Sequence, residues 1–367
     1  MTTSNRVFVI NSGSSSVKYQ VVDAETGEST VDGTIERIGE PGSDVPDHDA
    51  ALRIALESLG GDTDFAGVGH RVVHGGARFR DATLITPEVE AAIEELSALA
   101  PLHNPANLAG IRAARAALPD VPQVAVFDTA FHQTLQPEAY TYAVPPELGI
   151  RRYGFHGTSF AYVSREAARI LDAASKPHGR MVVLHLGNGA SACAVRDGVS
   201  VETSMGLTPL EGLVMGTRSG DIDPGALISL GLDSDRLDDL LNHRSGLLGL
   251  AGRSDLREVE QAAETGDAAA HLALEVYAHR IRAYIGAYAA QLGGLDALVF
   301  TAGVGERGAA MRARVLRGLE FLGLTLDPHR NAVSATVIST DDSRASILVV
   351  PTNEELEIAR QTIAARG

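Results

Sequence analysis

The sequence predicts an α/β protein that consists of two similar halves. Two apolar runs, Val7–Ile10 and Tyr19–Val22, flank a turn of Asn, Gly and Ser, a pattern typical of a β-hairpin. The same order of strand, small polar turn and strand recurs over residues 182–195. In both places the second strand ends in a turn that contains Asp and Gly. Because the two copies lie about half a chain apart, they indicate a duplicated fold.

The tips of both hairpins have the chemistry to hold an anionic oxygen. The first tip, residues 11–16, offers small side chains, hydroxyl groups and closely spaced backbone N–H groups, and Lys18 adds a positive charge just beyond it. The second tip covers residues 187–191. A polar turn without a ligand explains either hairpin alone, since Ser and Gly also dominate ordinary turns. The repetition favours two hairpins that hold the phosphates of a nucleotide between them.

The composition fits a globular protein of about two domains and argues against several other classes. The chain has 367 residues, of which 44% are hydrophobic and 21% charged. Its formal net charge of -16 argues against nucleic-acid binding, which needs a basic surface. The single cysteine, Cys193, leaves no disulfide framework. We find no secretory signal and no apolar run of about 18 residues, so we expect a cytoplasmic protein without a membrane segment.

The rest of the chain alternates between predicted helices and strands, as expected for the α/β class. The predicted helices cover residues 50–59, 88–100, 261–292, 309–322 and 354–365, and the predicted strands cover residues 121–126, 298–300 and 347–350. Thr86 is expected to cap the second helix, with Pro87 in its first turn, and Ser254 to cap a further helix. The tyrosines of the long helix 261–292 are expected in the core or at a subunit contact.

Eight short motifs follow one another between Asn11 and Glu355, over nearly the full chain. They are HRVVHGG (70–76), APLHNP (100–105), FDTAFH (127–132), GFHGTS (154–159), HLGNG (185–189), TPLEGLVMGTRSGDIDPG (208–225), FTAGVGE (300–306) and PTNEE (351–355). Together and in this order they closely resemble the motifs of the acetate kinase family.

The resemblance implies a duplicated actin-like (ribonuclease H-like) ATPase fold, with two domains around a nucleotide cleft, as in actin, Hsp70 and the sugar kinases. The first domain would cover residues 1–130 and 355–367 and carry the first phosphate hairpin. The second would cover residues 131–354 and carry the second phosphate loop and the adenosine site. The implied activity is reversible, Mg2+-dependent transfer of a phosphoryl group from ATP to acetate, directly and in line, to give acetyl phosphate and ADP. Mn2+ would substitute for Mg2+, and a homodimer would form, with helix 271–292 as a plausible contact surface.

The implied catalytic residues suit this chemistry. The acceptor carboxylate and the γ-phosphoryl group are both anionic, so the protein must position them and neutralise their charge. The acceptor is already ionised at neutral pH and needs no base. By resemblance, Arg71 and Arg218 grip the carboxylate and the phosphoryl oxygens, and His156 hydrogen-bonds the phosphoryl group. Asp128 would orient an arginine or a metal-bound water.

Three further groups of residues complete the implied site. Asn11 and Glu354 would hold Mg2+, although Glu354 could instead cap the last helix. The acyl substrate would contact Arg71, Val73, Leu102, Phe155 and Pro209, with Val73 on the same strand face as Arg71. The nucleotide would contact Ser14, Ser16, Lys18, His185, Leu186, Gly187, Asn188, Gly189, Asp255, Leu256, Arg257, Gly303, Val304, Gly305, Glu306 and Arg307.

Two departures from the family pattern and two rival functions stay open. The segment between Lys18 and His70 is shorter than usual, and Arg307 stands where the family usually has Asn, which leaves the contacts of that position open. The rivals are a propionate or short-chain acyl kinase and a non-catalytic actin-like nucleotide-binding protein. A dinucleotide-binding fold, suggested by Gly303-x-Gly305-x-x-Gly308 and Asp327, is excluded because only 40 residues follow Asp327.

Overall fold

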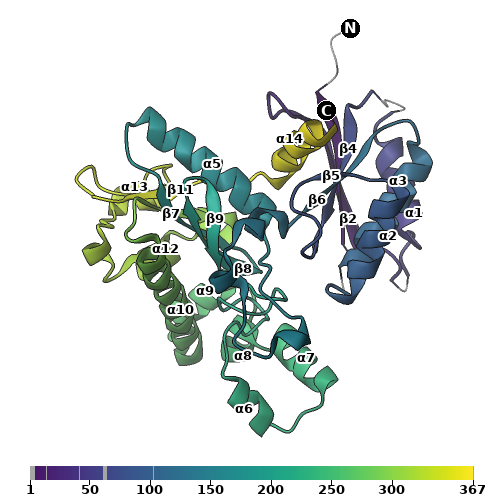
Figure 1. Ribbon diagram of the computed structural model, residues 1–367. Coiled ribbons are helices and arrows are strands. Elements are labelled where there is room, and N and C mark those ends of the chain that lie inside the picture. The colour runs from purple at the N-terminus through teal and green to yellow at the C-terminus, as the bar shows by residue number, and fades with distance from the viewer. Residues whose placement is uncertain (1–4, 14, 41, 61–63, 102, 367) are drawn as a thin grey trace. The chain divides into compact units, whose positions relative to one another are not determined.

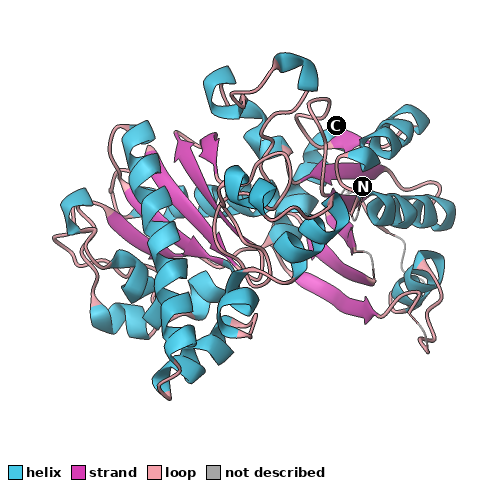
Figure 2. Cartoon of the chain, turned by 90° about the horizontal axis from the view of Figure 1, so that it is seen from below, coloured by secondary structure: helices cyan, strands magenta, loops and turns pink. Residues whose placement is uncertain are grey.

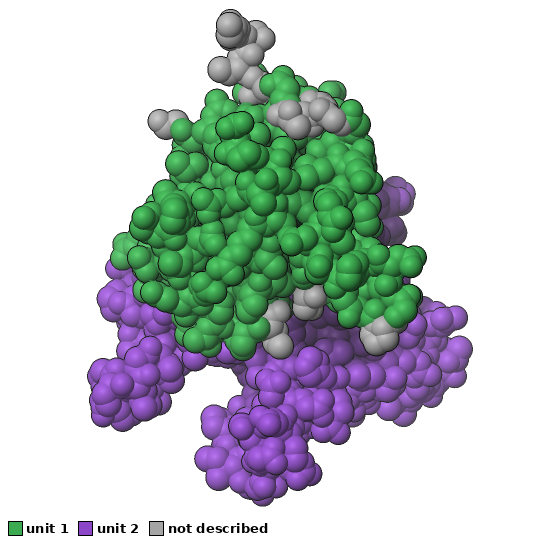
Figure 3. Space-filling view, turned by 90° about the vertical axis from the view of Figure 1, so that its right-hand side faces the viewer, with its two compact units in different colours: residues 1–133, 157–159, 353–367 green, residues 134–156, 160–352 purple. Residues whose placement is uncertain are grey.

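The computed structural model describes residues 5–13, 15–40, 42–60, 64–101 and 103–366. The chain divides into two compact units, coloured separately in Figure 3. Unit 1 comprises residues 1–133, 157–159 and 353–367, and unit 2 comprises residues 134–156 and 160–352.

The described part of unit 1 contains a six-stranded mixed sheet in the order β3-β2-β1-β4-β6-β5. Its strands are β1 (Arg6–Ser12), β2 (Ser16–Asp23), β3 (Ser29–Glu36), β4 (Gly67–Val72), β5 (Thr83–Leu84) and β6 (Gln123–Phe127). β1 and β2 form the predicted antiparallel hairpin, and β1, β4 and β6 run parallel to one another. Because β1, β4 and β6 are parallel, their carboxyl ends lie at the same edge of the sheet.

Helices cover both faces of this sheet. α14 (Glu354–Arg366) packs on one face, and α1 (His48–Glu57) and α3 (Asn104–Ala117), with α2 (Pro87–Glu95) beside them, lie on the other (Figure 1). The close approach of α14 requires a glycine in β4, because a Cβ at Gly69 would lie 2.5 Å from Thr362 Oγ1. The last helix of the chain therefore packs closely on the sheet that contains the first strands of the chain.

The described part of unit 2 contains a five-stranded mixed sheet in the order β11-β10-β7-β8-β9. Its strands are β7 (Arg180–Leu186), β8 (Ala190–Arg196), β9 (Val199–Thr203), β10 (Ala297–Thr301) and β11 (Ser346–Val349). β7 and β8 form the second predicted hairpin, and β7 runs parallel to β10, which runs parallel to β11. This order and these directions repeat those of β3-β2-β1-β4-β6, so the predicted duplication is confirmed.

Among the described residues, unit 2 contains more helices than unit 1. Figure 2 shows helices lying beside the strands. The helices are α4 (Pro137–Tyr140), α5 (Gly157–Ala173, whose first three residues belong to unit 1), α6 (Pro224–Ser229), α7 (Ser234–His243), α8 (Gly246–Ala251), α9 (Leu256–Glu264), α10 (Ala268–Leu292), α11 (Ala302–Arg307), α12 (Ala309–Leu316) and α13 (Pro328–Ala332). α10 packs on β7 and β8. Its Tyr277 and Tyr288 are buried, as predicted for the core. No helix among the described residues is long and apolar enough to cross a membrane.

Two predicted helices are wrong in extent because glycines interrupt them. The single helix over 261–292 is two helices, α9 and α10, separated at Gly266, whose φ of +95° no α-helix allows. Asp267 then caps α10 by accepting from Ala269 N and Ala270 N. The helix over 309–322 ends at Leu316, before Gly318 with a φ of +81°.

Other elements differ in smaller ways. α2 begins as predicted, with Thr86 as its cap and Pro87 in its first turn, but it ends at Glu95 and a short 3-10 turn follows. The strand predicted over 121–126 begins only at Gln123, because Pro122 has no N–H to donate. The helices α3 and α5 were not predicted at all.

Candidate active site

An ion pair joins two strand ends of unit 1. Arg71 lies near the end of β4, and Asp128 follows the last residue of β6, so the parallel strands place them side by side. Arg71 Nη2 lies 2.6 Å from Asp128 Oδ2, and Arg71 Nε donates to both carboxylate oxygens at 3.1 Å. Thr158 Oγ1 also donates to Asp128, at 3.3 Å. Burial works against the charged form of Arg71, but Asp128 and Glu354 outweigh it and raise the Arg71 pKa.

The first hairpin contributes polar groups to the same edge of the sheet. Asn11 on β1 and Lys18 on β2 face each other in the hairpin register. Arg71 Nη1 donates to Asn11 Oδ1 at 3.3 Å, which links the hairpin to the ion pair. Ser16 begins β2, and its carbonyl accepts from Gly13 N at 2.7 Å. The predicted nucleotide residue Ser14 lies outside the described residues.

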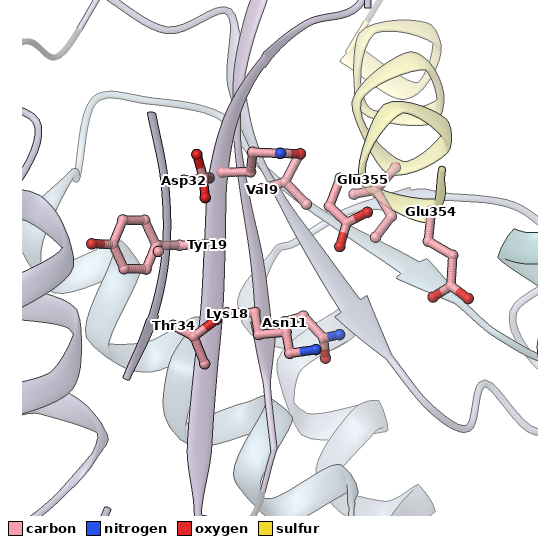
Figure 4. A pocket seen from close by; sticks show the side chains of 11 residues that line it. Val9, Asn11, Lys18, Tyr19, Asp32, Thr34, Glu354 and Glu355 are labelled. Atoms are coloured by element: carbon pink, nitrogen blue, oxygen red, sulfur yellow. The ribbon is translucent and has the colours of Figure 1, made fainter. Parts of the chain in front are cut away.

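A small acidic cavity lies beside these groups. It has a volume of about 150 Å³ and is lined by Asn11, Lys18, Glu354 and Glu355, among others (Figure 4). Burial raises the pKa of Glu354 to about 7, with Arg71 opposing the shift and Asp128 adding to it. The cap of α14 is Asn353, whose Oδ1 accepts from Leu356 N at 2.9 Å, so the capping bond does not come from Glu354. The cavity thus brings together side chains of the first hairpin, at the start of the chain, and of the PTNEE motif, near its end.

These donors fit a magnesium ion. Glu354 supplies a buried carboxylate to this cavity, and Asn11 adds an amide oxygen. Mg2+ prefers oxygen ligands and is usually held by one or two carboxylates, waters and the phosphates of a substrate. Among the described residues no group of three or more His, Cys, Asp or Glu side chains is placed to hold a metal.

A histidine of unit 2 is held by the second hairpin. His156 precedes α5 with a φ of +57°, a conformation rare for residues other than glycine. Its Nδ1 lies 2.7 Å from Ser191 Oγ, and its ring stacks on that of His185 with 4.1 Å between the ring centres. His185 on β7 and Ser191 on β8 are opposite each other in the hairpin.

Arg218 is an uncompensated cation in unit 2. Its Nη1 donates to the Pro209 carbonyl at 2.6 Å, but among the described residues it has no carboxylate partner. It is half-buried, and burial lowers its pKa. A Cβ built on Gly189 would lie 2.9 Å from Arg218 Nη2 and 3.5 Å from His156 Nε2, so both side chains converge on the turn of the second hairpin. The guanidinium group of Arg218 and the imidazole nitrogen of His156, converging on one turn, suit an anion.

A larger cavity of about 560 Å³ lies in unit 2. Its lining includes eight of the predicted nucleotide residues, which are Gly187, Asn188, Asp255, Leu256, Arg257, Gly303, Val304 and Arg307. Asp255, and not Ser254 as predicted, caps α9 by accepting from Arg257 N. The hydrogen bond from the Arg257 side chain lowers the pKa of Asp255 to about 2. The predicted nucleotide residues Gly303, Val304 and Arg307 lie on the short helix α11, which begins directly after β10.

The remaining predicted residues lie elsewhere. Leu186 and Gly305 are buried, and Glu306 accepts from Thr352 N at 3.1 Å, so these residues support the fold around the cavity. Val73 is buried but lies one residue beyond β4, so the argument from a shared strand face is wrong. Phe155 is buried and Pro209 half-buried, both in unit 2, whereas Val73 belongs to unit 1. Leu102 lies outside the described residues.

Several residues at these places were missed by the sequence analysis. Ser191 was quoted only as part of a turn, and Tyr277 and Glu260, which line the larger cavity, were not assigned to it. Asn107 on the unpredicted helix α3 accepts from Val73 N and donates to the Ser12 carbonyl, and so joins the end of β4 to the first hairpin. Asn104 and Asn107 are both buried on this helix, but the sequence analysis had no signal for their role because the helix itself was not predicted.

Comparison with known proteins identifies the family of the chain. Residues 6–360 match the acetokinase family. The chain belongs to the acetokinase family. An acetate kinase of Leifsonia xyli subsp. xyli is 57% identical over 393 aligned positions, which cover 98% of each chain. The alignment is longer than the 367 residues of this acetokinase family member, so the relative contains residues that this chain lacks.

Solved structures agree with this assignment. The acetate kinase of Porphyromonas gingivalis is 43% identical, with a TM-score of 0.92 over 98% of this chain and 99% of that one. A propionate kinase of Francisella tularensis is 42% identical, with a TM-score of 0.91 over 97% and 98%. A protein of Listeria monocytogenes described as an N-acetylmannosamine kinase is only 12% identical, with a TM-score of 0.50 over 98% of each chain. That likeness concerns the fold alone and extends it to sugar kinases, in agreement with the predicted actin-like class.

Proposed function

We propose that this acetokinase family member is an acetate kinase, which reversibly transfers the γ-phosphoryl group of ATP to acetate and gives acetyl phosphate and ADP. Family membership over residues 6–360 carries the proposal. The intact set of Asn11, Arg71, Asp128, His156 and Arg218 supports turnover over the rival of a non-catalytic nucleotide-binding protein.

The transfer would need charge control more than acid–base chemistry. An acetate oxygen forms a bond to the γ-phosphorus while the bond from that phosphorus to the ADP oxygen breaks, and the electron pair leaves with ADP. Because acetate is ionised at neutral pH, no base is required. The transition state is loose and carries its charge on the equatorial oxygens, so positioned cations and N–H donors provide the catalysis.

The two arginines would have different tasks. Arg218 has no counter-ion among the described residues, so its charge is available for the phosphoryl oxygens and the acceptor. Arg71 is held by Asp128, which fixes the direction of its guanidinium group. This favours Asp128 as the residue that orients an arginine, of the two roles that the resemblance allows. His156 would donate a hydrogen bond to the phosphoryl group.

Asn11 and Glu354 would hold Mg2+ or, in its place, Mn2+. The ion would shield the charges of the β- and γ-phosphates. The nucleotide would place its adenosine in the 560 Å³ cavity of unit 2 and its phosphates near the hairpin turns and Lys18. Arg307, an exposed residue in the lining of that cavity, would contact the nucleotide in place of the Asn that the resemblance implies.

The acceptor, the assembly and the location complete the proposal. Val73, Leu102, Phe155 and Pro209 would surround the methyl group of acetate. The similar propionate kinase of Francisella tularensis keeps propionate as the second candidate acceptor. We further propose a cytoplasmic homodimer. Most apolar side chains of α10 are buried within unit 2, so the exposed Ile228 and Leu230 are better candidates for the contact than helix 271–292.

Trapping of the acyl phosphate with hydroxylamine tests the proposal. With ATP, Mg2+ and acetate the purified protein should form acetyl hydroxamate, and omission of ATP should abolish it. Propionate and butyrate, at matched concentrations, give the order of acceptors. Nucleotide binding without hydroxamate from any of the three acids would favour the non-catalytic rival. A kcat/KM for butyrate equal to or above that for acetate would make the protein a longer-chain acyl kinase.

A further inference from the structure

In the hydrogen bond between Ser191 and His156, the surroundings of Ser191 determine which residue is the donor. Ser191 is completely buried on β8, and its Oγ lies 2.7 Å from His156 Nδ1. Among the described residues, Ser191 Oγ has no other hydrogen-bond partner. If Nδ1 carried the proton, the hydroxyl proton of Ser191 would be buried without an acceptor, which is unfavourable. The satisfied arrangement is a Ser191 hydroxyl that donates to an unprotonated Nδ1.

This direction decides which nitrogen of the imidazole is a donor. A neutral histidine carries one proton, so acceptance at Nδ1 leaves the proton on Nε2. Nε2 lies on the side of the ring where Arg218 Nη2 and the turn at Gly189 converge. Stacking on His185, the cross-strand neighbour of Ser191, keeps the ring from turning over.

We propose that Ser191 is a positioning residue that holds His156 in the Nε2–H tautomer, with this N–H as a hydrogen-bond donor to the transferred phosphoryl group. The hydrogen bond from Nε2–H to the phosphoryl group rests on the proposed function, whereas the tautomer of His156 is a property of the folded protein alone. A mispositioned or Nδ1-protonated ring would present a lone pair to an anionic oxygen, which repels it. The contribution of Ser191 should therefore fall on kcat more than on substrate binding.

The tautomer is tested directly by NMR. With 15N-labelled histidine, two-bond 1H–15N correlation spectra distinguish a protonated from an unprotonated ring nitrogen, and a His156→Gln variant assigns the signals. The wild type should show a protonated Nε2 and an unprotonated Nδ1 in its neutral ring. Ser191→Ala should show both tautomers, and Ser191→Thr, which keeps the hydroxyl, should resemble the wild type. A wild-type ring protonated at Nδ1 overturns the proposal, and this result does not depend on any variant of Ser191 folding.

Kinetics tests the consequence. Ser191→Ala should lower kcat about 10-fold, the effect of one lost hydrogen bond, with the KM values for ATP and acetate within about 2-fold, and Ser191→Thr should restore kcat. The matched control is Ser200→Ala, which removes the hydroxyl of another completely buried serine in the same sheet, on β9, and should keep kcat. An active wild type with an unchanged kcat in Ser191→Ala overturns the positioning role. A wild type that forms no acyl phosphate overturns the proposed function instead, and the NMR result still decides the tautomer.

Discussion

The two hairpins carry different chemistry at similar places, and the turn of the first is one residue longer than that of the second. One step before the last register pair, the first hairpin places Asn11 opposite Lys18, and the second places His185 opposite Ser191. Near the first pair lie three carboxylates, Asp128, Glu354 and Glu355. Near the second, Arg218 has no carboxylate partner among the described residues. Duplication supplied two similar hairpins, but the carboxylates beside the first suit a cation next to the phosphates, whereas Arg218 beside the second suits the phosphates themselves.

The arginines express the same contrast. Arg71 is tied to Asp128 through Nε and Nη2, so its charge is compensated before any ligand binds. Arg218 is bound to a neutral carbonyl, and burial lowers its pKa. Keeping an uncompensated cation partly buried costs stability, and such costs are typical of functional sites. The comparison therefore predicts that Arg218 matters mainly for rate and Arg71 for both rate and stability.

The largest expected effect comes from Arg218. Arg218→Ala should lower kcat about 100-fold to 1000-fold, because the charge it supplies is needed mostly in the transition state. Arg218→Lys should recover only part of this loss, since a point charge cannot replace the planar guanidinium group. Arg236→Ala, at an exposed arginine of α7, is the control and should be neutral. Steady-state kinetics by hydroxamate formation measures both. A near wild-type kcat for Arg218→Ala would remove Arg218 from the site.

The paired arginine should behave differently in stability. In a double-mutant cycle of Arg71→Ala and Asp128→Ala, we expect a coupling of about 1–3 kcal/mol in the free energy of unfolding. Each single substitution removes one side chain of the ion pair and leaves the charge of the other without its partner. Arg218→Ala should instead leave the free energy of unfolding unchanged or raise it. Urea unfolding followed by circular dichroism measures the wild type, the two single variants, the double variant and Arg218→Ala. Equal destabilisation by both arginine variants would erase the contrast between the two halves.

Much of this contrast could not be predicted from the sequence. The hairpins were predictable because alternating apolar runs and Gly-rich turns are local signals. The break at Gly266 was missed because the Ala-rich pattern on both sides outweighed one glycine, although Thr265-Gly266-Asp267 contains both a helix stop and a new cap. The motifs supplied the candidate site residues, and the resemblance gave Asp128 an arginine or a metal-bound water to orient, but neither identified Arg71 as its partner or Ser191 as the partner of His156. Arg71 meets Asp128 across 57 positions and His156 meets Ser191 across 35, distances that only the strand order brings together.

The acidic cavity of unit 1 gives the third prediction. Glu354→Gln should raise the Mg2+ concentration needed for half-maximal activity about 10-fold or more, because an amide oxygen binds a hard cation less well than a carboxylate. Glu355→Gln, at the next residue of the same helix and cavity, is the matched control and should have a smaller effect. Far-UV circular dichroism should be unchanged, since Asn353 supplies the cap of α14. Equal shifts in both variants would indicate a general effect of charge, and an unchanged Mg2+ titration in Glu354→Gln would exclude Glu354 as a ligand.

The smallest expected effect concerns the acyl group, for which Val73, Phe155 and Pro209 are proposed contacts. An apolar pocket distinguishes acids that differ by one methylene by only about 1–3 kcal/mol. We therefore expect acetate to be the best acceptor, propionate weaker and butyrate weaker still. Val73→Ala removes two methyl groups from the proposed acyl contact, so it should narrow the difference in kcat/KM between acetate and propionate. Val68→Ala removes the same atoms from the buried core at the other end of β4 and should lower stability without changing this preference. If Val73→Ala leaves the preference unchanged, selection of the acid belongs to the residues of unit 2.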